Sequence, residues 1–236
     1  MATRQLRIFA LALAALLFAG CAPAPPLFPV AAPSAPAGFP EAFYREAAAR
    51  GEPVFSIDAA RSQVLIRVYR GGSLGAKFGH DHLVSSRAVR GYALLPAAGA
   101  ARVDLYLPLD SLAVDDPERL VAERMPATLS AAGVEATRRN MLGAVLDAAH
   151  FPYAVIHGTC GSPACTELNA QITLHGVARR MTVPLELERN PRRLVASGHF
   201  DLRQTDFGIT PYSALGGALL VRDRLDLSFR IEAASD

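Results

Sequence analysis

The chain contains the stretch LNAQITLHGVARRMTVPLEL at residues 168–187, in which apolar and polar residues alternate on either side of His175-Gly176. Alternation with a period of two is typical of a β-strand with one buried face and one solvated face. The glycine favours a tight turn, because it lacks the Cβ that strains such backbone angles in other residues. We therefore predict a β-hairpin here. Its buried face comprises Leu168, Ala170, Ile172 and Leu174 before the turn, and Met181, Val183, Leu185 and Leu187 after it.

Similar alternation recurs along most of the chain from Val54 onward and predicts about eight strands joined mostly by short links. It is clearest at residues 64–69, 102–107 and 224–231, and a further strand is expected over about residues 79–95. Many short amphipathic strands are typical of a mainly β protein whose antiparallel sheet closes into a barrel or stacks as a sandwich. A barrel of this size holds either packed side chains or one small ligand.

One segment breaks the strand pattern and predicts a helical insertion around residues 116–150. Asp115 and Asp116 precede Pro117, and an acidic cap followed by proline in the first turn is typical of a helix start. Beyond this point apolar residues recur at helical spacing, namely Val134, Met141, Leu142 and Val145.

The first residues have the features of an export signal. Two arginines precede an apolar run to Phe18 that is too short to span a bilayer comfortably, and small residues follow the run. Its end, LFAGC, resembles the cleavage motif of bacterial lipoproteins, which implies removal of residues 1–20 and lipidation of Cys21. An ordinary secretory signal is the alternative. Residues 21–53 are rich in proline and alanine and predict an extended tether outside the core, with a short helix at about residues 41–50.

The lipoprotein resemblance implies a place on the periplasmic side of a bacterial cell envelope, with the membrane as a partner through the N-terminal lipid. Ala22 favours the outer membrane over the inner one, by resemblance to enterobacterial lipoproteins. Cys160 and Cys165 then remain as a pair, and the turn-forming residues between them make a disulfide plausible in an oxidising compartment. A metal site with CxxxxC spacing is the alternative, although no second cysteine pair exists to complete it.

The charge of the chain gives no support to a nucleic-acid partner. The formal net charge is +2, and it falls to zero when residues 1–20 with their two arginines are removed. No basic stripe marks a nucleic-acid surface. The sequence has no HExxH motif and no glycine fingerprint after a strand. We therefore expect a binding protein rather than an enzyme.

Four short stretches resemble sequence motifs of the YceI-like family of periplasmic proteins and occur in the same order: FSID at 55–58, VLDAAHFP at 145–152, ITLHGV at 172–177 and TDFGI at 205–209. The resemblance covers residues 54–233 and implies a lipocalin-like β-barrel that binds a polyisoprenoid or related lipid, such as an isoprenoid quinone, with no other cofactor. A carrier role, a stress-related role and a homodimer are compatible with it. Residues 66–70 lack a histidine that the family often has there, which implies a different headgroup preference.

The candidate ligand-binding residues form two groups. His80 and His82 lie two apart, so that on a strand they would share a face and contact a polar headgroup at the barrel mouth. They are also weak candidates for a zinc or copper site, which would need a third ligand, or they serve only to hold nearby backbone. A filled barrel in a structural lipoprotein is the remaining alternative. The apolar candidates are Val64, Ile66, Leu105, Ile172, Met181, Phe207, Leu227 and Phe229.

Overall fold

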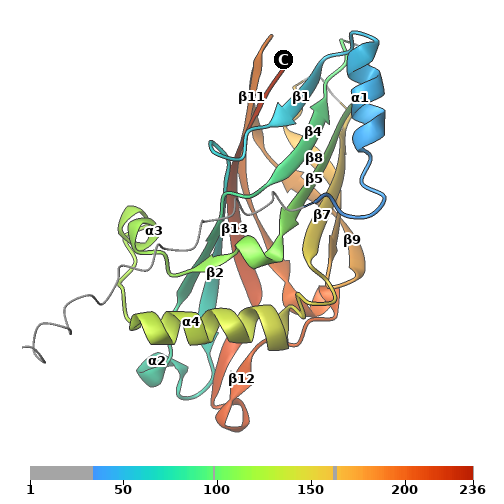
Figure 1. Cartoon of the computed structure of the whole chain (residues 1–236). Coiled ribbons are helices and arrows are strands. Elements are labelled where there is room, and N and C mark those ends of the chain that lie inside the picture. Colours follow the sequence, from blue (N-terminus) through green and yellow to red (C-terminus); the bar gives the residue numbers. More distant parts are fainter. Residues whose placement is uncertain (1–33, 98, 162–163, 236) are drawn as a thin grey trace, which may run out of the picture. The chain divides into compact units, whose positions relative to one another are not determined.

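Thirteen antiparallel strands form one sheet in the described part of the chain (Figure 1). The computed structural model describes residues 34–97, 99–161 and 164–235, so that the predicted signal peptide, Cys21 and the first part of the predicted tether lie outside the described residues. The strands are β1 (Val54–Ile57), β2 (Gln63–Gly71), β3 (His82–Ser86), β4 (Arg90–Leu94), β5 (Ala101–Pro108), β6 (Ala113–Val114), β7 (Tyr153–Cys160), β8 (Glu167–Leu174), β9 (Val177–Pro184), β10 (Glu186–Asn190), β11 (Arg193–Arg203), β12 (Ser213–Ala214) and β13 (Leu219–Ala234).

The mainly β, antiparallel class is confirmed, but hydrogen bonds do not close the sheet into a complete barrel. The ladder runs β6-β3-β2-β13-β1-β4-β5-β7-β8-β9, while β10 pairs with β11 and β11 with β13. β9 and β10 lie on either side of Leu185. Pro184 has no N–H to donate, and the N–H of Leu185 donates to the carbonyl of Thr166, just before β8, at 2.9 Å. The path therefore stays open between β9 and β11.

Apolar side chains occupy part of this opening. The short 3₁₀ helix η3 (Gln204–Phe207) lies next to β9, β11 and β13. Phe207 is completely buried in a cluster with Ala170 of β8, Val183 of β9 and Leu202 of β11. Packing of one aromatic ring therefore joins strands that no ladder connects.

β13 is the strand to which the rest of the sheet is tied. One edge of β13 pairs with β2 and, near the C-terminal end of β13, with β1. Its other edge pairs with β11 along residues 224–234. β12 folds back onto its first residues. The alternation predicted for residues 224–231 is confirmed as one strand that bonds on both sides. β13 thereby holds both halves of the sheet in register.

The prediction of one strand over residues 79–95 is wrong. β3 and β4 are separate strands with different neighbours, because β3 pairs with β2 and β6, whereas β4 pairs with β1 and β5. Gly91 shows why a local pattern missed this division. Its φ is 136°, and a Cβ there would lie 2.0 Å from the carbonyl oxygen of Asp104. The close approach of β4 to β5 depends on that missing side chain.

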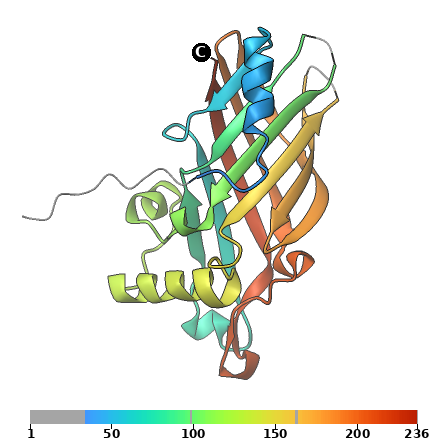
Figure 2. The same ribbon diagram turned by 45° about the vertical axis from the view of Figure 1, so that its right-hand side comes forward.

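The helical insertion is confirmed, and its longest helix lies across the lower half of the sheet in Figure 2. Asp116 caps α3, since its carboxylate accepts from the N–H of Arg119 at 3.1 Å, and Pro117 is the first helical residue. Within the described residues no helix is long and apolar enough to cross a membrane. The helical elements besides η3 are α1 (Glu41–Ala49), α2 (Gly75–Phe78), η1 (Leu109–Ser111), α3 (Pro117–Ala122), α4 (Ala131–Asn140), the π-helical turn η2 (Met141–Val145) and η4 (Leu215–Gly217).

Helix α1 corrects the last part of the predicted tether, residues 21–53. The helix packs against β1 and β4, and both Tyr44 and Ala47 are completely buried. The ring of Tyr44 stacks on Tyr92 of β4 with centroids 5.1 Å apart. The chain from Ser34 onward therefore belongs to the same compact unit as the strands. The short helix expected at about residues 41–50 is confirmed, whereas its packing against the strands was not predicted.

The hairpin of residues 168–187 is confirmed in its turn and first strand. Leu174 pairs with Val177, and His175 and Gly176 between them have φ values of 52° and 73°, as a tight two-residue turn requires. The ring of Phe151 lies over the turn, where a Cβ on Gly176 would come within 2.6 Å of it. The second predicted strand differs, because it is interrupted at Leu185.

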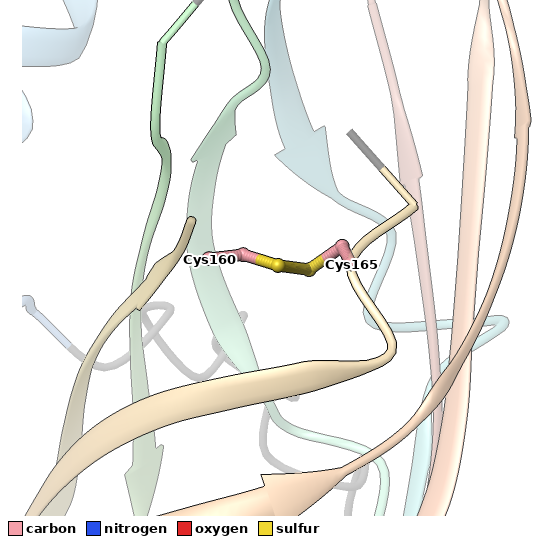
Figure 3. Close-up of a disulfide and its surroundings, with 2 residues drawn as sticks. All are labelled: Cys160 and Cys165. Atoms are coloured by element: carbon pink, nitrogen blue, oxygen red, sulfur yellow. A yellow bond between two sulfur atoms is a disulfide. The ribbon is translucent and has the colours of Figure 1, made fainter. Parts of the chain in front are cut away.

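The predicted disulfide is confirmed. Cys160 at the end of β7 is bonded to Cys165 before β8, with their Cα atoms 5.5 Å apart (Figure 3). The bond links the two ends of the short connection between neighbouring strands. Both cysteines are buried, and both lie at the wall of the cavity described next.

Candidate ligand cavity

The inward faces of the strands enclose a cavity of about 540 Å³. Residues from β2, β5, β8, β11 and β13 line it, and the π-helical turn η2 contributes Met141 and Val145. The lining is dominated by aliphatic side chains together with Phe78, Phe200 and Phe229. Such a wall excludes charged or strongly hydrated molecules and favours a hydrocarbon.

The alternation of side chains along each strand produces this wall. On β2, Val64, Ile66 and Val68 face the cavity, whereas Arg67 and Tyr69 face the other side of the strand. On β8 the inward positions are the four that the sequence analysis placed on one face. The period of two that identified the strands therefore also identifies the cavity face.

Partial exposure of inward side chains shows that the interior is hollow. Val64, Ile66 and Val68 lie in a strand with neighbours on both edges and point inward, yet each is only half-buried. Leu227 and Phe229 on β13 are half-buried in the same way. In a filled core such side chains would be enclosed by close-packed neighbours. This exposure counts against the alternative of a barrel filled by its own side chains.

The structure brings most of the predicted ligand-binding residues to the cavity and leaves two outside its wall. Met181 packs against the buried cluster around Phe207, beneath η3, and Phe207 itself has no exposed surface. Strand parity could not anticipate that η3 covers this part of the sheet. The predicted residues at the wall are Val64, Ile66, Leu105, Ile172, Leu227, Phe229, His80 and His82.

The cavity opens to solvent at the end formed by α2, the residue before β12 and the first residues of β13. Phe78 and Tyr212 both line it, with relative exposures of 59% and 38%. At the opposite end the lining residues Leu95, Leu194 and Ala233 are buried. We call the first end the mouth. Phe78 and Tyr212 were not predicted from the sequence, because each lies outside the alternating strands.

Three polar side chains of the lining, Arg70, His80 and His82, lie at the mouth. The Nδ1 of His82 lies 2.7 Å from Oδ2 of Asp115, whose Oδ1 accepts from the N–H of Leu83 at 2.8 Å. Arg70 donates to the carbonyl of Gly79 at 2.9 Å. These contacts hold one imidazole and one guanidinium at the end of a hydrocarbon-lined space.

A smaller pocket of about 180 Å³ adjoins the mouth and shares Arg70, His80 and His82 with it. Arg67 and Tyr69, on the other face of β2, complete its polar side. Arg67 is paired with Glu123 at 2.5 Å. In the part of the chain that the structure describes, no group of three or more His, Cys, Asp or Glu side chains is arranged to hold a metal ion.

One motif escaped the sequence analysis. Residues 71–75 read GGSLG, which matches the GxSxG spacing of serine hydrolases, and they connect a strand to a helix. The serine of such an elbow sits on a sharp, strained turn. Here the positive φ belongs to Gly72, at 85°, and not to Ser73. The backbone therefore departs from a nucleophile elbow at Ser73, the residue that would have to be the nucleophile.

A second polar cluster anchors α1, and one of its members, Arg102, also lines the cavity. The buried carboxylate of Asp104 accepts from the Tyr44 hydroxyl at 2.6 Å and from Nε of Arg102 at 2.7 Å, and it lies 2.5 Å from Nδ1 of His157. Burial raises the pKa of Asp104, but the hydrogen bonds from Tyr44, His157 and Arg102 outweigh it and hold that pKa below its ordinary value. Burial, reinforced by the bond to Asp104, raises the pKa of Tyr44.

Comparison with known proteins gives a family and a fold. The sequence matches the family of YceI-like domains over residues 55–233. No curated protein matches it. BcnA of Burkholderia cenocepacia is similar in structure, with 15% identity and a TM-score of 0.53 over 75% of this chain and 98% of that one. A polyisoprenoid binding domain from Saccharophagus degradans, implicated in plant cell wall breakdown, has 14% identity and a TM-score of 0.55 over 78% and 99% of the two chains.

Proposed function

The chain belongs to the YceI-like domain family, and we propose that it binds a long apolar molecule, a polyisoprenoid or an isoprenoid quinone, inside its cavity. The observation that carries the proposal is the hollow, hydrocarbon-lined interior. Its volume of about 540 Å³ lies within the roughly 300–1,000 Å³ typical of small-ligand sites. Each methylene buried there contributes about 0.8 kcal/mol. The similar domain of Saccharophagus degradans is itself described as polyisoprenoid binding.

We place the head of the ligand at the mouth. Arg70 and His80 and His82 are the polar groups that a ligand reaches there once its tail fills the cavity. Arginine donates in a planar fork and imidazole donates or accepts, so that these groups suit a carbonyl or an anionic headgroup. Burial of the tail then supplies affinity, while the polar mouth sets the direction of insertion.

Membrane tethering is the second part of the proposal. Lipidation of Cys21 would hold the domain on the periplasmic side of the envelope, where it would carry its ligand to or from a membrane. The experiment is fractionation of cells that express the wild type or the Cys21→Ser variant. We expect the wild type in the membrane fraction and the variant in the soluble periplasmic fraction. Equal membrane association of both would refute the anchor.

The binding proposal is tested by identifying what the protein carries. Protein purified from membranes is extracted with organic solvent, and the extract is analysed by mass spectrometry beside an extract from a mock purification. We expect an isoprenoid lipid at a fixed ratio to protein, and a lower ratio in the cavity variant Ala196→Leu than in its neighbour Ser197→Leu. Ala196 lines the cavity, whereas Ser197 alternates to the outer face. No enrichment over the mock would refute the proposal.

A further inference from the structure

Exposed apolar side chains concentrate around the mouth of the cavity. Within the described residues, four large hydrophobic side chains are strongly exposed, and three of them belong to this end: Phe78 at 59%, Tyr212 at 38% and Leu215 at 73%. The fourth, Val121, is 79% exposed and lies on α3. Solvent exposure of single apolar residues is ordinary, but their gathering at the opening of an apolar cavity points to a partner.

Hydrogen bonds hold the two segments that carry these residues next to each other. The N–H of Leu74, just before α2, donates to the carbonyl of Ala218 at 2.8 Å, and Nε of Arg222 donates to the carbonyl of Arg70 at 3.0 Å. Figures 1 and 2 show α2 and the β12 hairpin at the same end of the sheet, beyond α4. We call residues 70–82 and 210–222 the rim.

The rim has an excess of positive charge. It contains three basic residues, Arg70, Lys77 and Arg222, and a single carboxylate, that of Asp81. Lys77 is the one lysine of the chain, and its Nζ lies 5.4 Å from the centre of the Phe78 ring. An aromatic ring with a neighbouring ammonium matches the boundary of a bilayer, where the ring enters among the acyl chains and the cation contacts phosphate.

We propose that the rim docks onto an anionic lipid bilayer and that the cavity exchanges its ligand with the membrane through this contact. The proposal rests on the proposed function, because it needs an apolar ligand in the cavity. Continuity favours a bilayer as the partner: the lining passes without interruption from the interior to Phe78 and Tyr212. A hydrocarbon tail that leaves the cavity there enters the membrane without crossing water, whose contact would cost about 0.8 kcal/mol per methylene.

The experiment uses the absence of tryptophan from the whole chain, which makes one introduced tryptophan a specific reporter. Leu215→Trp places it on the rim but outside the cavity lining, so that its signal reports membrane contact rather than cavity loading. Val121→Trp is the matched control on another exposed apolar position. Each intact variant is mixed with vesicles of phosphatidylcholine and phosphatidylglycerol in equal parts, with brominated acyl chains as quencher.

We expect a blue shift and strong quenching for Leu215→Trp and neither for Val121→Trp. In the Leu215→Trp background, Lys77→Gln should weaken vesicle binding about fivefold, the equivalent of one cation at an anionic surface. Phe78→Ser should weaken it about tenfold or more, through lost apolar burial. No quenching at position 215, or equal quenching at both tryptophans, would overturn the proposal. If the same protein carries an extractable lipid, that outcome rejects docking and leaves the proposed function standing.

Discussion

Replacement of Ala196 by leucine tests whether the interior is hollow. Ala196 lies in the middle of β11, lines the cavity and is half-buried, so that added atoms would enter the space rather than a packed layer. The change adds three carbon atoms, and at about 0.8 kcal/mol for each buried carbon they contribute about 2 kcal/mol. In ligand-free protein the free energy of unfolding should rise by up to this amount.

The same substitution should weaken ligand binding. The leucine side chain occupies space that the ligand would otherwise fill. A loss of about 2 kcal/mol of binding free energy corresponds to a roughly 30-fold increase in Kd. Stability and affinity therefore move in opposite directions. This combination separates a cavity residue from one whose substitution simply damages the fold.

The assay is urea unfolding of delipidated protein with the disulfide intact, followed by titration with an isoprenoid lipid. In thermal unfolding of the same delipidated protein, a gain of about 2 kcal/mol corresponds to a rise of roughly 4–8 °C in Tm for a domain of this size. Ser197→Leu serves as the control, because it adds a similar side chain on the opposite face of the same strand. If the interior is filled, Ala196→Leu will instead destabilise the protein by about 1–3 kcal/mol through overpacking. That sign would refute the reasoning.

Three further predictions concern the remaining structure. Tyr44→Phe should lower the free energy of unfolding by about 1.5 kcal/mol, because it removes a donor to a buried carboxylate, whereas Tyr92→Phe, with an exposed contact at 3.4 Å, should change it by less than about 0.5 kcal/mol in the same urea assay. Since the pKa of Asp104 is depressed in the folded state, its hydrogen bonds stabilise the fold above about pH 4, and this stabilisation is lost as the pH falls through the pKa of the folded state. Urea unfolding curves from pH 7 to 3 should show this loss of stability in the wild type and a smaller loss in Asp104→Asn. Reduction of the Cys160–Cys165 bond, which spans a separation of 5 residues, should cost about 2 kcal/mol by the loop-entropy relation, measured with and without reductant; an unchanged midpoint would contradict it.

The strands and the cavity face follow from the sequence because side chains on a strand alternate. Val64, Ile66 and Leu227 were assigned to an inner face by parity alone, and the structure places them at the cavity wall. The hairpin turn was predictable for a similar reason, since His175-Gly176 sits between two alternating runs and glycine accepts the positive φ. These are local properties, and local sequence contains them.

Other features depend on partners that are distant in sequence. The role of Tyr44 is set by Asp104, 60 residues away, so that its own segment predicted a short helix but not the burial of that helix against the strands. Phe207 was assigned to the ligand site, yet η3 places it in a core between strands that do not pair. The mouth is formed by two irregular connections, and no periodic pattern marks Phe78 or Tyr212. Burial could therefore be predicted only where the alternation along a strand decides it, and not where it depends on contacts between distant parts of the chain.

The position of β13 has a consequence for folding. β13 comes after every other strand in the sequence, yet β1, β2, β11 and β12 all pair with it. Before it is available, the facing edges of β2 and β11 expose unpaired amide and carbonyl groups, which readily recruit strands from other molecules. Assembly must therefore wait for contacts between distant parts of the chain, which makes it slow and cooperative. A fragment without residues 219–234 is expected to aggregate rather than to fold into a smaller version of the domain.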